Sequence, residues 1–146
     1  MKEFKGRVLA GGTYKGECIV SHNGLNTLAT FQSSAIKGAK KVIASDQNNP
    51  DLYGKNITGI AVILPQTIGS TTGGMVLQVI CSMKINPACL LFSESIDSLA
   101  AAGTVLATVW ENSDMIVIDR LGKEILEVAQ SGGQVEVKED GTVIVL

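Results

Sequence analysis

The segment GSTTGG, residues 69–74, combines hydroxyl groups and glycines in a way that suits a binding site for a small anion. An apolar run that ends at Pro65 precedes it, and apolar residues at helical spacing follow it, so the chain changes there from strand to helix. The first turn of a helix offers unpaired N–H donors and a partial positive charge, which favour carboxylate or phosphate groups. The sequence therefore predicts an anion site in which Ser70 presents its hydroxyl to the ligand. The other groups expected to bind the ligand are those of Gly69, Thr71, Thr72 and Gly73.

The same residue types also have a purely structural interpretation. A Ser or Thr before a helix is a common N-cap, and glycine supplies positive φ in tight turns. Two named motifs are excluded: the segment lacks the Gly-Lys-Ser/Thr of a P-loop, and Ile68 occupies the first glycine position of Gly-x-Ser-x-Gly. The residue pattern alone leaves both interpretations open.

Histidine and cysteine, which serve most often in acid–base and metal chemistry, are sparse. His22 is the single histidine and follows a strand-like run, so it is either a loop residue or a catalytic base. Cys18, Cys81 and Cys89 form neither an even set nor a C-x-x-C pair, and we expect them to be buried apolar side chains. The alternative is that Cys81 and Cys89 meet in space in a redox or cluster role. We expect this chain alone to bind no metal.

Composition restricts the class of protein and its partners. The chain has 146 residues, is 45% hydrophobic and carries interspersed charges with a formal net charge of -2. This length and composition predict a single domain, residues 1–146, with one core. The charge pattern offers no electrostatic field for nucleic acid or an anionic membrane, and no apolar run is long enough for a membrane span. We therefore expect a cytoplasmic protein without a nucleic-acid or membrane partner.

The elements that must position the GSTTGG segment are predicted from periodicity. Apolar strand-like runs lie at 57–65, 86–93 and 114–119. Helical patterns separate them, one from Thr72 onward and one at 95–110 with Ser95 or Asp97 as its N-cap. The order strand, helix, strand, helix, strand predicts a parallel βαβαβ core.

The two ends of the chain predict antiparallel additions to that core. Residues 6–12 and 16–22 are expected to pair as strands, and residues 134–146 to form a hairpin that turns at Asp140-Gly141. A last helix is expected within 120–133. Residues 23–50 are expected to be a loop with a short strand at 41–44 and a turn at DQNNP. The predicted class is α/β.

Several motifs, taken in order, carry a resemblance to a known family. They are GGTYKGECIVS, NPDLYGKNITGIAVILP, GSTTGG, NPACLLFSES and AAGTVLATVW. Their order resembles the small, swivelling subunit or domain of the aconitase X family over most of residues 5–120. The most specific part is LYGK at 52–55, leading into a strand and followed by GST at 69–71.

The resemblance implies a swivelling β/β/α domain that belongs to a two-piece dehydratase. In this family a large subunit or domain carries an iron-sulfur cluster on cysteines, and the small one closes over a hydroxylated carboxylate. The resemblance assigns the catalytic base to Ser70 and implies that the chain is inactive without its large subunit. Positive charge for that serine would come from the partner or from Lys55.

The early loop departs from the family pattern. FQSSAIKG keeps an aromatic, Phe31, which the resemblance places in the substrate pocket, but lacks the glycines that usually follow. The expected substrate is cis-3-hydroxy-L-proline, and the alternative is mevalonate 5-phosphate. A non-catalytic small-anion module or a regulatory subunit is also open. A two-piece enzyme predicts that the face around Ser70, Phe31 and Tyr53 is exposed and apolar in the isolated chain.

Overall fold

Four parallel strands form the centre of the protein, which a computed structural model describes over residues 1–68, 73–110 and 112–146. They are β3 (Tyr14–Val20), β5 (Ala61–Leu64), β7 (Cys89–Phe92) and β8 (Ile116–Asp119). They lie in the order β3, β5, β7, β8 within an eight-stranded sheet. Every residue of β5, β7 and β8 is buried, as expected for parallel strands covered on both faces.

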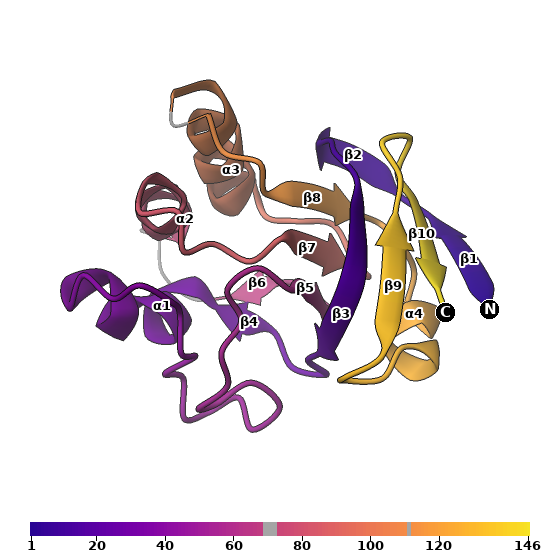
Figure 1. Cartoon of the computed structure of the whole chain (residues 1–146), viewed down its shortest axis with the longest axis horizontal. Coiled ribbons are helices and arrows are strands. Elements are labelled where there is room, and N and C mark those ends of the chain that lie inside the picture. The colour runs from indigo at the N-terminus through magenta and orange to yellow at the C-terminus, as the bar shows by residue number, and fades with distance from the viewer. Residues whose placement is uncertain (69–72, 111) are drawn as a thin grey trace.

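Three helices cover one face of these strands (Figure 1). They are α1 (Thr27–Ile36), α2 (Gly73–Ser82) and α3 (Ser98–Trp110), and they share one apolar core with the side chains of Ile19, Val62, Leu64, Leu90 and Phe92. None of the helices within the described ranges is long and apolar enough to cross a membrane.

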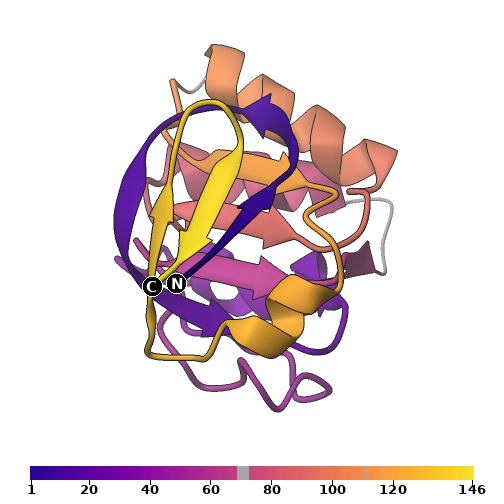
Figure 2. The ribbon, with the colours of Figure 1, turned by 90° about the vertical axis from the view of Figure 1, so that its right-hand side faces the viewer.

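An antiparallel layer covers the opposite face, as Figure 2 shows. It consists of β1 (Lys2–Lys5), β9 (Gln134–Val137) and β10 (Thr142–Val145), with the short helix α4 (Glu124–Val128) beside it. These elements share a second apolar core with Cys18, Val20, Ile63, Leu91 and Ile118, the alternate residues of the same parallel strands. The two cores give the predicted β/β/α layering, with the parallel sheet in the middle.

The predicted βαβαβ core and the closing hairpin are confirmed. β5, α2, β7, α3 and β8 follow one another, and the three strands are parallel. Asp97 is the N-cap of α3, because its Oδ1 accepts a hydrogen bond from Ala100 N at 2.9 Å. The hairpin turns at Gly141, whose φ of 92° is readily adopted by glycine.

The predicted pairing of the first two strand-like runs is wrong. β2 (Arg7–Ala10) lies at the edge of the sheet and pairs with β8, whereas β3 lies in the middle between β9 and β5. The side chains explain this separation. The apolar half of β3, Cys18–Val20, is buried inside the parallel sheet, while Arg7 of β2 binds Asp119 at the end of β8.

Helix α1 replaces part of the predicted loop. Its Thr and Ser residues have modest helix propensity, but Thr27, Thr30, Phe31 and Ser34 are buried and Asn26 caps the helix by accepting from Ala29 N at 3.1 Å. Tertiary burial therefore stabilises a helix that the local pattern does not predict. The short strand expected at 41–44 is reduced to a single bridge between Ile43 and Asn56.

Close approach of two glycines sets the packing of α2 against α3. A Cβ built on Gly103 would lie 2.1 Å from the carbonyl oxygen of Gly74 and 2.4 Å from its Cα. Both obstructing atoms belong to the backbone, so a side chain at position 103 could be accommodated only by separating the helices.

We therefore expect Gly103→Ala to lower the free energy of unfolding by about 1–3 kcal/mol, because overpacking displaces one helix. Urea denaturation measures this value. The matched control is Gly11→Ala, where the added Cβ would meet Val8 at an ordinary 3.6 Å. Equal stability of the two variants would contradict the proposed close contact.

Candidate functional site

Polar residues gather where the parallel strands end, at the edge of the sheet where ligands usually bind in such folds. Ser21 follows β3, and its N–H donates to Ile63 O at 2.8 Å. Ser93 follows β7, and its N–H donates to Leu64 O at 2.9 Å. Asp119 ends β8. These contacts, with the parallel pairing of β7 and β8, place the carboxyl ends of four neighbouring strands side by side.

The chain reaches α2 from this edge through β6 (Thr67–Ile68), which pairs with β4 (Leu25–Asn26). Gly73 is the first residue of α2. The other predicted site residues of this segment, Gly69, Ser70, Thr71 and Thr72, lie outside the described residues. Their roles stay predictions.

The start of α3 is attached to β6 by one carboxylate. The Thr67 hydroxyl donates to Asp97 Oδ2, while Asp97 Oδ1 caps α3. Both oxygens of Asp97 are therefore occupied. This bond fixes residues 95–97 beside the strand that leads to the predicted anion segment.

A buried carboxylate joins β8, β2 and the approach to α3. Asp119 is fully buried and accepts from Arg7 Nε at 3.0 Å and from an Arg7 terminal nitrogen at 2.7 Å. The N–H of Ile96 donates to the same carboxylate at 2.9 Å. The hydrogen bond to Asp119 is the main reason that the pKa of Arg7 is raised. The charges of Arg7 and Asp119 compensate each other, and we interpret the pair as structural because it joins β2 to β8.

Arg120 follows Asp119 and has an unusual backbone conformation. Its φ is 60°, in the left-handed region, which costs a residue with a side chain about 1–2 kcal/mol. Its N–H donates to Glu94 O at 3.0 Å, and its Nε donates to Ser95 Oγ at 3.1 Å. The backbone and the side chain of Arg120 are thus both held against the stretch that follows β7.

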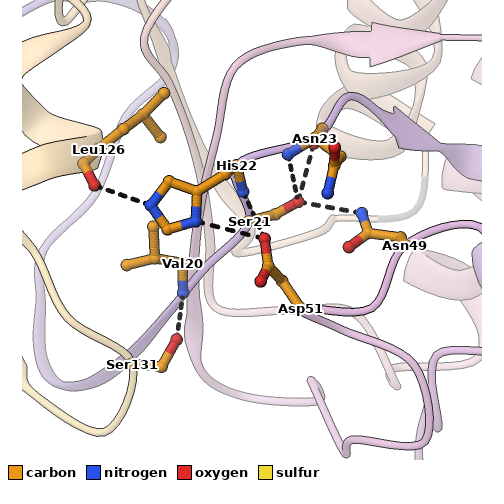
Figure 3. A network of polar contacts seen from close by, with 8 residues as sticks. All are labelled: Val20, Ser21, His22, Asn23, Asn49, Asp51, Leu126 and Ser131. Atoms are coloured by element: carbon orange, nitrogen blue, oxygen red, sulfur yellow. Dashed lines mark hydrogen bonds and ion pairs between the residues drawn. The ribbon is translucent and has the colours of Figure 1, made fainter.

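His22 lies directly after β3, and both of its ring nitrogens have partners (Figure 3). Nδ1 lies 3.3 Å from Asp51 Oδ2, and Nε2 lies 3.2 Å from Leu126 O. The backbone N–H of His22 donates to the same Asp51 oxygen at 2.7 Å. The ring therefore joins the end of β3 to the loop 46–54 and to α4. A catalytic base needs a nitrogen that is free to accept a proton, so this geometry favours the structural interpretation of His22.

A buried serine–asparagine pair lies next to His22. Asn49 Nδ2 donates to Ser21 Oγ at 2.9 Å, and Ser21 Oγ donates to Asn23 O at 2.8 Å (Figure 3). Asn49 Oδ1 and Ser93 Oγ are buried without a hydrogen-bond partner in the described part of the chain. Ser93 follows β7, and Asn49 contacts the end of β3 from the loop 46–54, so an unsatisfied polar atom lies at or beside two strand ends, which is uncommon in protein interiors.

Phe31, Tyr53 and Lys55, three residues expected at or near the site, differ in exposure and in location. Phe31 is fully buried in the core under the helices, so its predicted exposure is wrong. The physical reason is α1, which turns this aromatic ring inward. Tyr53 is 50% exposed. Lys55 lines a hollow with Glu17, Ile19 and Ser131, beside β3 and away from the carboxyl ends of β5 and β7.

The cysteines are buried as predicted. Cys18 and Cys81 are 1% exposed and Cys89 is 0% exposed. Burial raises the pKa of Cys89 to about 12, so this residue is a neutral thiol at physiological pH. Within the described ranges, no group of three or more His, Cys, Asp and Glu side chains is arranged to hold a metal ion.

Two larger hollows lie away from the strand ends. One, of about 580 Å³, lies at the amino ends of the parallel strands and is lined by Gly59, Lys84, Asn86 and Asp114 among others. The other, of about 770 Å³, lies beside the end of α1 and is lined by Lys37, Lys40 and Lys41 among others. Neither contains the polar residues that gather at the carboxyl ends.

Sequence reasoning missed Asn49, Asp51 and Arg120. The signal for Arg120 was present, because it directly follows a predicted parallel strand. The loop residues had no such signal, since their contacts with Ser21 and His22 join segments about 28 positions apart.

Known proteins resemble this chain over nearly its whole length. A family model described as the aconitase X swivel domain matches residues 3–146. The phosphomevalonate dehydratase small subunit of Methanocella arvoryzae is 28% identical over 140 residues, which cover 96% of this chain and 94% of that protein. The protein of the same name from Thermococcus kodakarensis is 26% identical over 140 residues, covering 95% and 98%. A crystal structure of Thermococcus kodakaraensis aconitase X in its holo form matches this chain with a TM-score of 0.82 at 24% identity. The match covers 100% of this chain and 99% of the chain in that crystal structure, and it supports the fold.

The contacts of Asp51 predict the effect of removing its carboxylate. We expect Asp51→Ala to lower the free energy of unfolding by about 1–2 kcal/mol, because the His22 N–H and ring lose their shared acceptor. Hydrogen exchange should show that the His22 amide loses protection. Asp114→Ala is the control, since Asp114 is exposed and has no side-chain hydrogen bond in the described ranges. Equal effects of the two substitutions would refute this role of Asp51.

Proposed function

This chain belongs to the aconitase X swivel domain family, and we propose that it is the small subunit of a two-subunit hydro-lyase that dehydrates phosphomevalonate. The observation that carries the proposal is the extent of the match. Relatives named phosphomevalonate dehydratase small subunit align with 95–96% of this chain and with 94–98% of their own length. The remainder of the active site would belong to a separate large subunit.

The choice of substrate follows the relatives. Their names favour mevalonate 5-phosphate over cis-3-hydroxy-L-proline. Phosphomevalonate presents two anionic groups, a carboxylate and a phosphate. Anion binding suits the edge where the first turn of α2 and Arg120 lie.

Dehydration requires one proton and one hydroxyl group to leave adjacent carbons, with formation of a carbon–carbon double bond and water. We assign removal of the proton to Ser70. A serine hydroxyl is a weak base, so its deprotonated form must be stabilised by nearby donors or positive charge. The segment that contains Ser70 leads directly into α2, whose first N–H groups and helix dipole would provide this stabilisation.

An iron-sulfur cluster is part of the proposal only as a group on the large subunit. The described residues of this chain contain no donor set for a metal, and two of the cysteines, Cys18 and Cys89, have pKa values raised by burial. The proposal therefore gives this chain no step that passes through the cluster. What this chain contributes is the base and the binding of the substrate's anionic groups.

Apolar side chains flank the predicted catalytic segment on both sides. Ile68 is 46% exposed and Met75 on α2 is 67% exposed, while Leu77 and Ile80 of the same helix are buried. In the proposed complex the large subunit would cover these two side chains, as interfaces cover exposed apolar surface. Their place beside residues 69–72 supports an active site that the large subunit closes.

The two-subunit proposal predicts that this chain co-purifies with an aconitase X-type large subunit when the two are co-expressed. We expect the complex to dehydrate phosphomevalonate and each subunit alone to be inactive, because neither holds the whole site. Turnover is followed by mass spectrometry of the substrate and product. Faster turnover of cis-3-hydroxy-L-proline would reverse the choice of substrate, and a stable complex that dehydrates neither would favour a regulatory subunit.

We expect Ser70→Ala to reduce kcat of the complex by at least about 10³-fold, since general-base catalysis is lost. The two subunits should still co-elute in size-exclusion chromatography. Ser82→Ala, at the far end of α2, is the matched control and should retain full activity. Wild-type kcat in Ser70→Ala would exclude Ser70 as the base.

A further inference from the structure

The two arginines of the chain, Arg7 and Arg120, are close in space to the same carboxyl end but differ in their partners. Arg7 makes two hydrogen bonds to the buried carboxylate of Asp119 and is neutralised by it. Arg120 makes no ion pair with a carboxylate in the described ranges, and its side chain is hydrogen-bonded to a neutral hydroxyl. Arg120 is therefore a positive charge that the fold itself leaves uncompensated.

The guanidinium of Arg120 is oriented before any ligand arrives. Its Nε donates to Ser95 Oγ at 3.1 Å, and its two terminal nitrogens have no hydrogen-bond partner in the described ranges, so both can bind a ligand. Two terminal N–H donors in one plane match two oxygens of a phosphate group. Because Arg120 is exposed, a ligand can reach it from solvent.

The surrounding backbone holds Arg120 in a left-handed conformation, which residues other than glycine rarely adopt. The N–H groups of Arg120, Leu121 and Gly122 donate to the carbonyls of residues 94, 92 and 93 at 3.0, 3.0 and 2.9 Å. These bonds fix the start of the arginine side chain. Strain of this kind is frequent where a side chain must be presented to a ligand.

A short chain of contacts connects Arg120 to the predicted catalytic segment. Arg120 binds Ser95, and two residues further along Asp97 binds Thr67, the penultimate described residue before 69–72. The two carboxylates of this stretch have other partners in the described ranges. Asp97 is occupied by Thr67 and the α3 N-terminus, and Glu94 lies 3.9 Å from Lys123.

We propose that Arg120 binds the phosphate group of the substrate and so determines specificity for a phosphorylated hydroxy acid. This inference rests on the proposed dehydratase function. It adds a division of tasks, in which Ser70 acts at the carboxylate end of the substrate and Arg120 holds the phosphate at the end of β8.

The test compares the wild-type complex with Arg120→Asn in steady-state kinetics with phosphomevalonate. Asparagine tolerates the left-handed backbone, so the variant should fold while losing the charge. We expect KM to rise by about 10- to 100-fold, because a charge-assisted bidentate contact is lost, with kcat changed much less. Inorganic phosphate should inhibit the wild type competitively and the variant at least about 10-fold more weakly. Arg120→Lys should restore part of both effects.

Each outcome decides the inference. The control is Lys138→Asn, which removes an exposed charge from the antiparallel layer and should change neither KM nor inhibition. Unchanged KM and phosphate inhibition in Arg120→Asn would overturn the role of Arg120, as would a loss of kcat accompanied by a lower melting temperature. A wild-type complex without dehydratase activity would instead refute the proposed function on which the inference rests.

Discussion

Burial of the parallel strands on both faces is the constraint on which the rest of this structure depends. The side chains of β5, β7 and β8 are all buried, because the helices cover one face and the antiparallel layer covers the other. An unpaired polar group is costly in an apolar interior of this kind. Polar side chains therefore gather where the strands end, and the proposed site lies at their carboxyl ends.

Most of the charged residues discussed at this edge hold the fold together, and Arg120 remains available to bind a ligand. Asp119 and Arg7 neutralise each other while fixing β2 and the approach to α3. Asp97 joins β6 to α3, and Asp51 joins the loop 46–54 to His22. These bonds rigidify the segments from which a ligand would be held, and they leave Arg120 without a carboxylate partner in the described ranges. Rigid support of this type reduces the cost of ordering a site when substrate binds.

The domain supplies one side of a proposed active site. The close contact of Gly74 with Gly103 fixes the first turn of α2, so that the helix N-terminus has a defined direction. Apolar side chains remain exposed next to it, at Ile68 and Met75. A small subunit that presents anion-binding groups beside an apolar surface can close over a substrate held by a larger partner.

The sequence by itself determined the α/β class, the βαβαβ core, the hairpin at Gly141 and the burial of the cysteines, because each depends on local periodicity or on composition. Its motif order also indicated the family. Only the tertiary structure decided that β2 and β3 separate, that α1 turns Phe31 inward, and that His22 is engaged by Asp51 and Leu126. Those outcomes depend on contacts between residues far apart in the chain, and no short window of sequence contains both partners of such a contact.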